Sequence, residues 1–182
     1  MNIGFDLDKV FIDYPFFVPD KLIDRLYKKE SNGDLLYRIP SNLEQIIRKA
    51  SHHPFLRPVI KKNIEFLLTI PKKNNKLYLV SSRFGFLKNR TELLVKNLEF
   101  DKIFDGIYFN YKNIQPHLFK NAIIDKLDLD IYVEDDFPLV KYLAKHHRKT
   151  SFFWLNNKKG KKMLTRNIFA ISNISDILPR NQ

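Results

Sequence analysis

Short apolar runs alternate with amphipathic segments along this chain, and the alternation predicts strands and helices in turn. The runs expected to form strands are 2–8, 76–82, 104–109, 130–136, 151–155 and 168–171. Apolar positions recur at helical spacing in 21–29, 43–50, 57–70, 86–98, 116–127 and 137–146, with a further short helix near 175–178. Because the strands are nearly continuous apolar runs that alternate with helices, we expect an α/β fold with a Rossmann-like parallel sheet flanked by helices.

The stretch 14–55 interrupts this alternation, between the first strand and the first core helix. It opens with an aromatic segment broken by Pro15 and Pro19, which is expected to form a packed loop. Two helical patterns follow, separated by a turn at 31–34. We therefore predict a core domain of residues 1–13 and 56–182, and a small helical insertion of residues 14–55.

Polar side chains gather at the carboxyl ends of three predicted strands. They are Asp6 and Asp8, Ser81 and Ser82, and Glu134, Asp135 and Asp136. Ligands of doubly wound α/β folds bind at this edge of the sheet, near the point where the strand order reverses. The sequence therefore predicts that these residues meet in one site.

The pair Asp6 and Asp8 carries the first chemical prediction. In an extended strand the two side chains point the same way, because side chains alternate with a period of two. Adjacent carboxylates repel each other, so a cation or a proton is needed between them. Mg²⁺, which prefers oxygen ligands, is the expected cofactor.

Composition restricts the classes of protein to be considered. The 182 residues are 44% hydrophobic and include no cysteine, so the chain can build a core but has no disulfide, thiol nucleophile or thiolate metal site. No apolar run approaches the roughly 18 residues of a membrane span. We expect a soluble, cytoplasmic protein with no membrane partner.

The chain is strongly basic, with 32 Lys and Arg against 20 Asp and Glu. A formal charge of +12 favours anionic partners, and nucleic acid is one of them. In that alternative the protein binds or processes nucleic acid, and the loop lysines Lys158, Lys159, Lys161 and Lys162 contact phosphates. The basic residues are scattered rather than gathered on one helix, which favours a small phosphorylated substrate instead.

Four segments in order carry a family resemblance: Ile3–Val10 with its Asp-x-Asp, the strand ending at Ser81, the helical Lys120, and the strand ending in Glu134-Asp135-Asp136. This ordered set resembles the haloacid dehalogenase (HAD) superfamily of phosphohydrolases, over most of the chain from residue 2 to about 155. Within it, the chain looks closest to the small members similar to deoxyribonucleotidases. The insertion at 14–55 matches the place where this superfamily carries its smaller type of cap.

The resemblance implies a Mg²⁺-dependent phosphatase that acts through an aspartyl-phosphate. It implies that Asp6 is the nucleophile and Asp8 the general acid and base. Ser81 and Lys120 would hold the phosphate of the substrate. Asp6, Asp135 and the main-chain carbonyl of Asp8 would bind the metal.

The assignments of the serine, the lysine and the acidic metal ligand each leave an alternative open. Ser82 could share or take the role of Ser81, and Lys112 and Lys126 compete with Lys120. Glu134 and Asp136 could contact and orient the metal ligand Asp135 without binding the metal themselves. The histidines have no partners with ligand-like spacing and are read as surface residues: His52, His53, His146 and His147.

Overall fold

A seven-stranded sheet forms the centre of the protein, in a computed structural model that describes residues 1–15, 28–31, 34–156 and 162–178. The strand order is β5-β4-β1-β6-β7-β9-β8, and every neighbouring pair is parallel except β8 and β9. The strands are β1 (Asn2–Phe5), β4 (Lys76–Ser81), β5 (Gly106–Phe109), β6 (Ile131–Glu134), β7 (Ser151–Leu155), β8 (Lys162–Thr165) and β9 (Ile168–Ile171). The predicted α/β fold with a parallel Rossmann-like sheet is confirmed.

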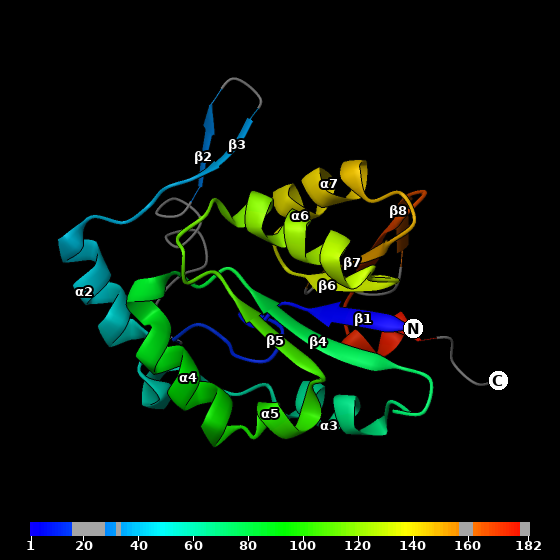
Figure 1. Cartoon of the computed structure of the whole chain (residues 1–182), viewed down its shortest axis with the longest axis horizontal. Coiled ribbons are helices and arrows are strands. Elements are labelled where there is room, and N and C mark those ends of the chain that lie inside the picture. The colour runs from blue at the N-terminus through cyan, green and yellow to red at the C-terminus, as the bar shows by residue number, and fades with distance from the viewer. Residues whose placement is uncertain (16–27, 32–33, 157–161, 179–182) are drawn as a thin grey trace.

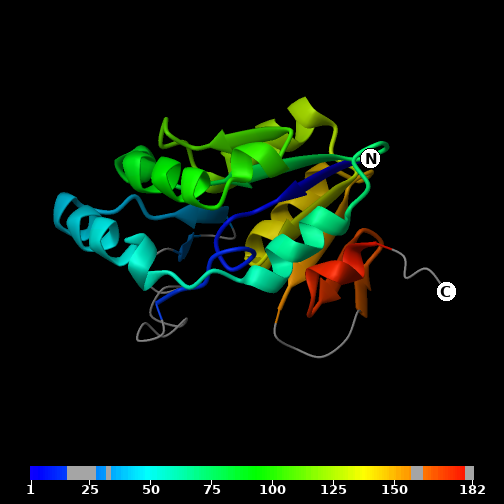
Figure 2. The same ribbon diagram turned by 90° about the horizontal axis from the view of Figure 1, so that it is seen from below.

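Helices cover both faces of the sheet (Figure 1 and Figure 2). One face carries α6 (Pro116–Leu127) and α7 (Phe137–His146), which pack on Tyr132 and Phe152 of the central strands. The other face carries α3 (Lys61–Thr69), α4 (Lys88–Asn97), α5 (Phe100–Ile103) and the short helix η3 (Ile174–Ile177), with η2 (Gly85–Leu87) leading into α4. Among the described residues, no helix is both long enough and apolar enough to cross a membrane.

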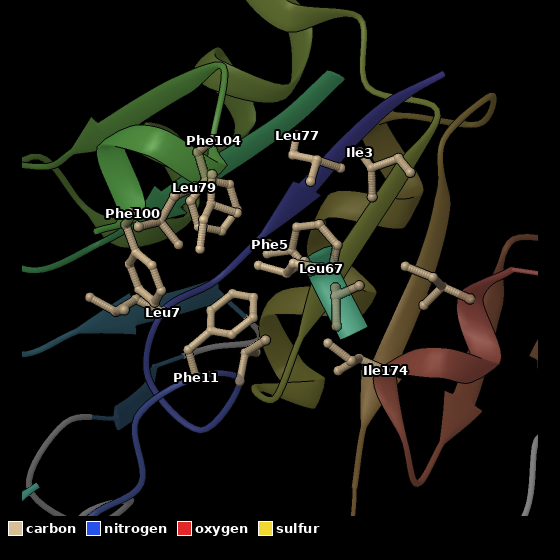
Figure 3. Packing of buried hydrophobic residues seen from close by; sticks show 14 of the residues in the cluster. Ile3, Phe5, Leu7, Phe11, Leu67, Leu77, Leu79, Phe100, Phe104 and Ile174 are labelled. Atoms are coloured by element: carbon tan, nitrogen blue, oxygen red, sulfur yellow. The ribbon is translucent and has the colours of Figure 1, made fainter. Parts of the chain in front are cut away.

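Phenylalanine rings fill the core on the α3–α5 face (Figure 3). Phe5 of β1 lies 5.7 Å from Phe11 and 6.3 Å from Phe104, measured between ring centroids, and Phe100 packs edge-on against the last two. All four rings are buried. This packing fixes β1 and the loop after it, the segment that carries Asp6 and Asp8.

Gly4 lies on the opposite face of β1, where no side chain fits. A Cβ atom at this position would stand 2.5 Å from Leu129 Cδ1 and 2.8 Å from the ring of Tyr132. The ring of Tyr132 occupies the space instead, and its hydroxyl donates a 3.1 Å hydrogen bond to the carbonyl oxygen of Val80. Gly4 therefore lets an aromatic side chain of β6 lie directly against β1.

The insertion between β1 and the core is mixed rather than helical. Strand β2 (Lys28–Ser31) pairs antiparallel with β3 (Asp34–Tyr37), and α2 (Asn42–Ser51) and the short helix η1 (Pro54–Leu56) follow. The helix predicted for 21–29 lies mostly outside the described residues, and its last two residues belong to β2. In the sequence the two strands flank Asn32-Gly33, a pair that is typical of two-residue hairpin turns.

Three boundaries also differ from the predictions. The helix expected from 57 begins at Lys61, because Pro58 and Ile60 form backbone hydrogen bonds with the loop after β1. The strand expected over 104–109 begins at Gly106, because α5 occupies 100–103. An additional strand, β8, pairs with β9, and the basic segment before it lies mostly outside the described residues.

Candidate active site

A cavity of about 150 Å³ opens at the carboxyl ends of β1, β4 and β6. Every predicted site residue lines it: Asp6, Asp8, Ser81, Ser82, Lys120 and Asp135. Residues 79 and 133 pair with Phe5 of β1 from either side, so the ends of three adjacent strands reach the same edge of the sheet. The insertion also lines the cavity, through Tyr37, Arg38 and Arg48.

Three carboxylates converge on the floor of this cavity. Asp6, Glu134 and Asp135 each offer an oxygen, and these oxygens lie within 4.8 Å of one another. They come from the ends of β1 and β6, which are parallel neighbours, so the fold itself brings them together. We call these three residues the acidic cluster.

Lys120 reaches the acidic cluster from α6. Its Nζ atom lies 2.7 Å from Asp6 Oδ1 and 2.5 Å from Glu134 Oε2, and the residue is 2% exposed. The helix begins with Pro116 in its first turn, which places Lys120 one turn further along and pointing at the strand ends. The rival candidates Lys112 and Lys126 do not line the cavity.

Burial and mutual repulsion raise the pKa values of two carboxyl groups in the acidic cluster. Burial, opposed by Lys120 and reinforced by Glu134 and Asp8, raises the pKa of Asp6 to about 7. Burial and the adjacent Glu134 and Asp6 raise the pKa of Asp135 well above its usual range. Burial disfavours the charge of Lys120, but Asp6 and Glu134 outweigh it and raise the pKa of this lysine. Buried carboxylates this close together fit a hard divalent cation, because such a cation would replace mutual repulsion by attraction.

Asp8 has a different environment, although only one residue separates it from Asp6. Arg83 binds its carboxylate through two hydrogen bonds, of 2.9 Å from Nε and 2.7 Å from Nη2, and Arg57 binds the same carboxylate. The Nε atom of Arg57 also donates a 2.7 Å hydrogen bond to the carbonyl oxygen of Asp13. Burial alone would raise the pKa of Asp8, but Arg83 and Arg57 outweigh it and hold this pKa far below its usual range. The carboxylate of Asp8 is therefore bound by two arginines. The prediction that Asp8 binds the metal concerns its main-chain carbonyl and stays a prediction.

Lys9 shapes the turn that follows Asp8. It adopts a left-handed conformation with φ 62°, and its amide donates a 2.7 Å hydrogen bond to the carbonyl oxygen of Ile12. Its Nζ atom lies 2.8 Å from Asp13 Oδ1 and 4.5 Å from the centroid of the Tyr14 ring. Strand β1 ends at Phe5 and the chain bends at Leu7, between the two aspartates, which explains why their carboxylates meet different partners.

Both serine candidates lie at the end of β4 and line the cavity. Ser81 is 1% exposed. The hydroxyl of Ser82 is buried and has no hydrogen-bond partner within the described residues. A hydroxyl in that state is a ready donor to an anion, so both serines stay candidates for the phosphate ligand.

Several residues of the cavity were not predicted. Arg57 and Arg83 flank Asp8, while Arg48 and His52 project from α2. Arg83 follows Ser81-Ser82 directly, and this position after a strand end was the signal that could have identified it.

The surface reading of the histidines is wrong at two positions. His52 and His147 are each 9% exposed. Helix α2 turns His52 towards the cavity, where its Nδ1 atom donates a 2.8 Å hydrogen bond to the carbonyl oxygen of Arg48. His147 lies between Asn121 and Asp125 of α6.

No protein-family model and no curated protein matches the chain. Solved structures do match. A protein described as a haloacid dehalogenase-like hydrolase from Bacteroides fragilis has a TM-score of 0.59 and 14% identity, covering 97% of this chain and 99% of its own. A HAD-superfamily hydrolase from Ehrlichia chaffeensis has a TM-score of 0.56 and 14% identity, covering 97% and 93%. The chain therefore has a HAD-like fold, as its ordered motifs predicted.

Proposed function

We propose that this protein is a Mg²⁺-dependent phosphatase that hydrolyses a small phosphate monoester through an aspartyl-phosphate on Asp6. The observation that carries the proposal is the acidic cluster, with Lys120 2.7 Å from Asp6, at the carboxyl ends of parallel strands. An ordinary α/β sheet does not need two buried carboxylates, a half-buried one and a buried lysine together at its strand ends. The HAD-like fold supports the same reading.

In this proposal an oxygen of Asp6 attacks the phosphorus, and the ester oxygen leaves on the opposite side. Lys120 and the serines Ser81 and Ser82 hold the phosphoryl oxygens and compensate their charge. Asp6, Asp135 and Glu134 would hold the Mg²⁺, together with the main-chain carbonyl of Asp8. The bound cation would reduce the repulsion between the anionic nucleophile and the anionic substrate.

Asp8 completes the reaction as a proton carrier. Its position beside Asp6 suits it to take a proton from the water that hydrolyses the aspartyl-phosphate. Arg57 and Arg83 favour its ionised form, which is the form required for that second step. Donation of a proton to the leaving group in the first step requires substrate to loosen this arginine clamp.

We also propose that the substrate is a small molecule and that the protein is cytoplasmic. The cavity of about 150 Å³ is smaller than the roughly 300–1,000 Å³ of typical ligand pockets. That size favours a compact phosphorylated metabolite over nucleic acid. Of the loop lysines in the nucleic-acid alternative, only Lys162 lies within the described residues, at the start of β8.

A panel of phosphate esters, assayed for released phosphate with Mg²⁺ and with EDTA, tests the proposal. We expect activity with Mg²⁺, loss of activity with EDTA, and a loss of roughly a thousandfold or more in Asp6→Asn. Asp101→Asn, an exposed aspartate of α5, is the matched control and should keep the parental rate. Parental turnover in Asp6→Asn would exclude this nucleophile, and full activity in EDTA would exclude the metal.

A further inference from the structure

Tyr37, the last residue of β3, attaches the insertion to the core domain. Its amide donates a 3.0 Å hydrogen bond to Oε1 of Gln115, the N-cap residue of α6, and Nε2 of the same glutamine donates a 3.2 Å hydrogen bond to its carbonyl oxygen. The rings of Tyr37 and His117 are stacked, with 6.3 Å between their centroids. The backbone and the ring of Tyr37 therefore fasten β3 to the start of α6.

The hydroxyl of Tyr37 makes a separate contact, with the segment that carries the acids. It donates a 2.7 Å hydrogen bond to Oδ2 of Asp136, the N-cap residue of α7. Burial and the adjacent Asp136 raise the pKa of Tyr37, so the hydroxyl keeps the proton that it donates. The attachment of β3 to α6 does not involve this hydrogen bond, which connects the insertion to the end of β6 instead.

Hydrogen bonds continue from Asp136 into the acidic cluster. The amide of Asp136 donates a 3.3 Å hydrogen bond to Oε1 of Glu134. Lys120 Nζ lies 2.5 Å from Oε2 of the same carboxylate and 2.7 Å from Asp6 Oδ1. A connected series of polar contacts therefore runs from Tyr37 of the insertion to the proposed nucleophile.

The geometry of the acidic cluster depends on where the segment 134–136 lies. Glu134 and Asp135 supply two of the three converging carboxylates. Trp154 of β7 fixes this segment from the core, through a 2.9 Å hydrogen bond from Nε1 to the carbonyl oxygen of Asp135. Tyr37 fixes it from the insertion, at Asp136. Groups that orient metal ligands without touching the metal typically change its affinity by about 10- to 100-fold when they are removed.

Resting on the proposed function, we infer that Tyr37 is a positioning residue, which acts through Asp136 to hold Glu134 and Asp135 where they bind Mg²⁺. Tyr37 contacts neither the metal nor the phosphoryl group in this role. Its backbone and ring attach β3, and its hydroxyl orients the end of β6. The insertion then contributes to metal binding as well as to the lining of the cavity.

Mg²⁺ binding to Tyr37→Phe tests this inference, because the change removes the hydroxyl and keeps the ring. Calorimetric titration with MgCl₂ should give a dissociation constant about 10- to 100-fold higher than in the parent. The Tm in EDTA should fall by about 5 °C or less, since one hydrogen bond is lost. Tyr142→Phe removes a hydroxyl from α7 outside the cavity and should bind Mg²⁺ like the parent. Equal Mg²⁺ affinity of Tyr37→Phe and the parent would overturn the inference.

Gln115→Met separates positioning from attachment. This change removes both hydrogen bonds to the backbone of Tyr37 but leaves its hydroxyl and Asp136 in place. We expect Gln115→Met to weaken Mg²⁺ binding less than Tyr37→Phe does. An equal or larger loss in Gln115→Met would mean that Tyr37 only attaches β3, and would overturn the positioning role.

A double variant tests the path through Asp136. Asp136→Ala should weaken Mg²⁺ binding, and Tyr37→Phe/Asp136→Ala should bind Mg²⁺ like Asp136→Ala alone, because the hydroxyl has lost the group on which it acts. Additive losses in the double variant would overturn this path.

This inference and the proposed function fail in different ways. Equal Mg²⁺ affinity of Tyr37→Phe and the parent, with Mg²⁺-dependent hydrolysis by the parent, would reject the positioning role and retain the phosphatase. Weaker Mg²⁺ binding in Tyr37→Phe, with no phosphate ester hydrolysed by the parent, would reject the phosphatase and retain the positioning role. A parent that binds no Mg²⁺ would reject both.

Discussion

Only Leu7 separates Asp6 from Asp8, yet the two carboxylates have opposite environments. Asp6 lies among Glu134, Asp135 and a single lysine, and its pKa is raised to about 7. Asp8 lies between two arginines, and its pKa is held far below the usual range. The Asp6 side therefore has an excess of negative charge, and the Asp8 side is already compensated.

This difference shows that a short motif does not determine the chemistry of its residues. The bend at Leu7, just after the end of β1, lets the two side chains meet different partners, which come from distant parts of the chain. An excess of negative charge suits a cation site, because a cation adds attraction where repulsion would otherwise act. A compensated carboxylate is better suited to orientation and proton transfer than to binding a metal through its side chain.

Removal of Lys120 is the strongest way to disturb the Asp6 side. Lys120→Met leaves Asp6 and Glu134 buried without their shared cation, so we expect a loss of about 3–5 kcal/mol in the free energy of unfolding at pH 7 in EDTA. Urea denaturation measures this loss. The control Lys126→Met, on an exposed position of the same helix, should change stability by less than about 0.5 kcal/mol. Equal stability of the two variants would mean that the acidic cluster does not need its lysine.

Addition of Mg²⁺ tests the acidic cluster by adding a cation instead of removing one. Saturation at about a hundred times the dissociation constant should stabilise the parent by about 2.7 kcal/mol, seen as a higher Tm. Asp135→Asn removes a buried carboxyl with a raised pKa, so this variant should be at least as stable as the parent in EDTA but should gain little from Mg²⁺. NaCl at matched ionic strength controls for screening, and an unchanged Mg²⁺ effect in Asp135→Asn would exclude Asp135 as a ligand.

The pH dependence of stability tests the environment of Asp8, because His52 lies near the same two arginines. Burial and then Arg83 and Arg57 lower the pKa of His52 to about 3. Below its ordinary pKa of 6.5 the unfolded chain takes up a proton that the folded chain refuses, so stability falls as the pH drops from 6.5 towards 3. Between pH 7 and pH 5 the parent should lose on the order of 2 kcal/mol more than His52→Gln. The exposed His53→Gln should behave like the parent, and equal pH dependence of parent and His52→Gln would contradict the assignment.

The sheet and the acidic side of the site followed from local patterns in the sequence. Parallel strands buried on both faces read as continuous apolar runs, and their ends carry Asp6, Ser81 and Asp135 within a few residues of each run. Lys120 was predictable because α6 begins at a proline and precedes the strand that carries the acids. These signals lie within single elements, so no tertiary information was required.

The arginine side could not be predicted in the same way. Arg57 reaches Asp8 only because residues 58 and 60 pair with the loop after β1, a contact between segments more than 40 residues apart. The position of Arg48 depends on α2 turning its apolar stripe outwards, which its apolar pattern argues against. The apolar spacing in 21–29 predicts a helix where Lys28 and Lys29 belong to β2, although Asn32-Gly33 is typical of a hairpin turn.

The missing side chain at Gly4 connects the two groups proposed to hold phosphate. The space that it leaves admits the Tyr132 ring, which lies 5.7 Å from Lys120 Nζ and whose hydroxyl binds the carbonyl oxygen of Val80, next to Ser81. A methyl group at position 4 would push this ring outwards and shift the lysine and the end of β4 together. The spacing of the two groups proposed to hold phosphate thus depends on a residue that does not line the cavity.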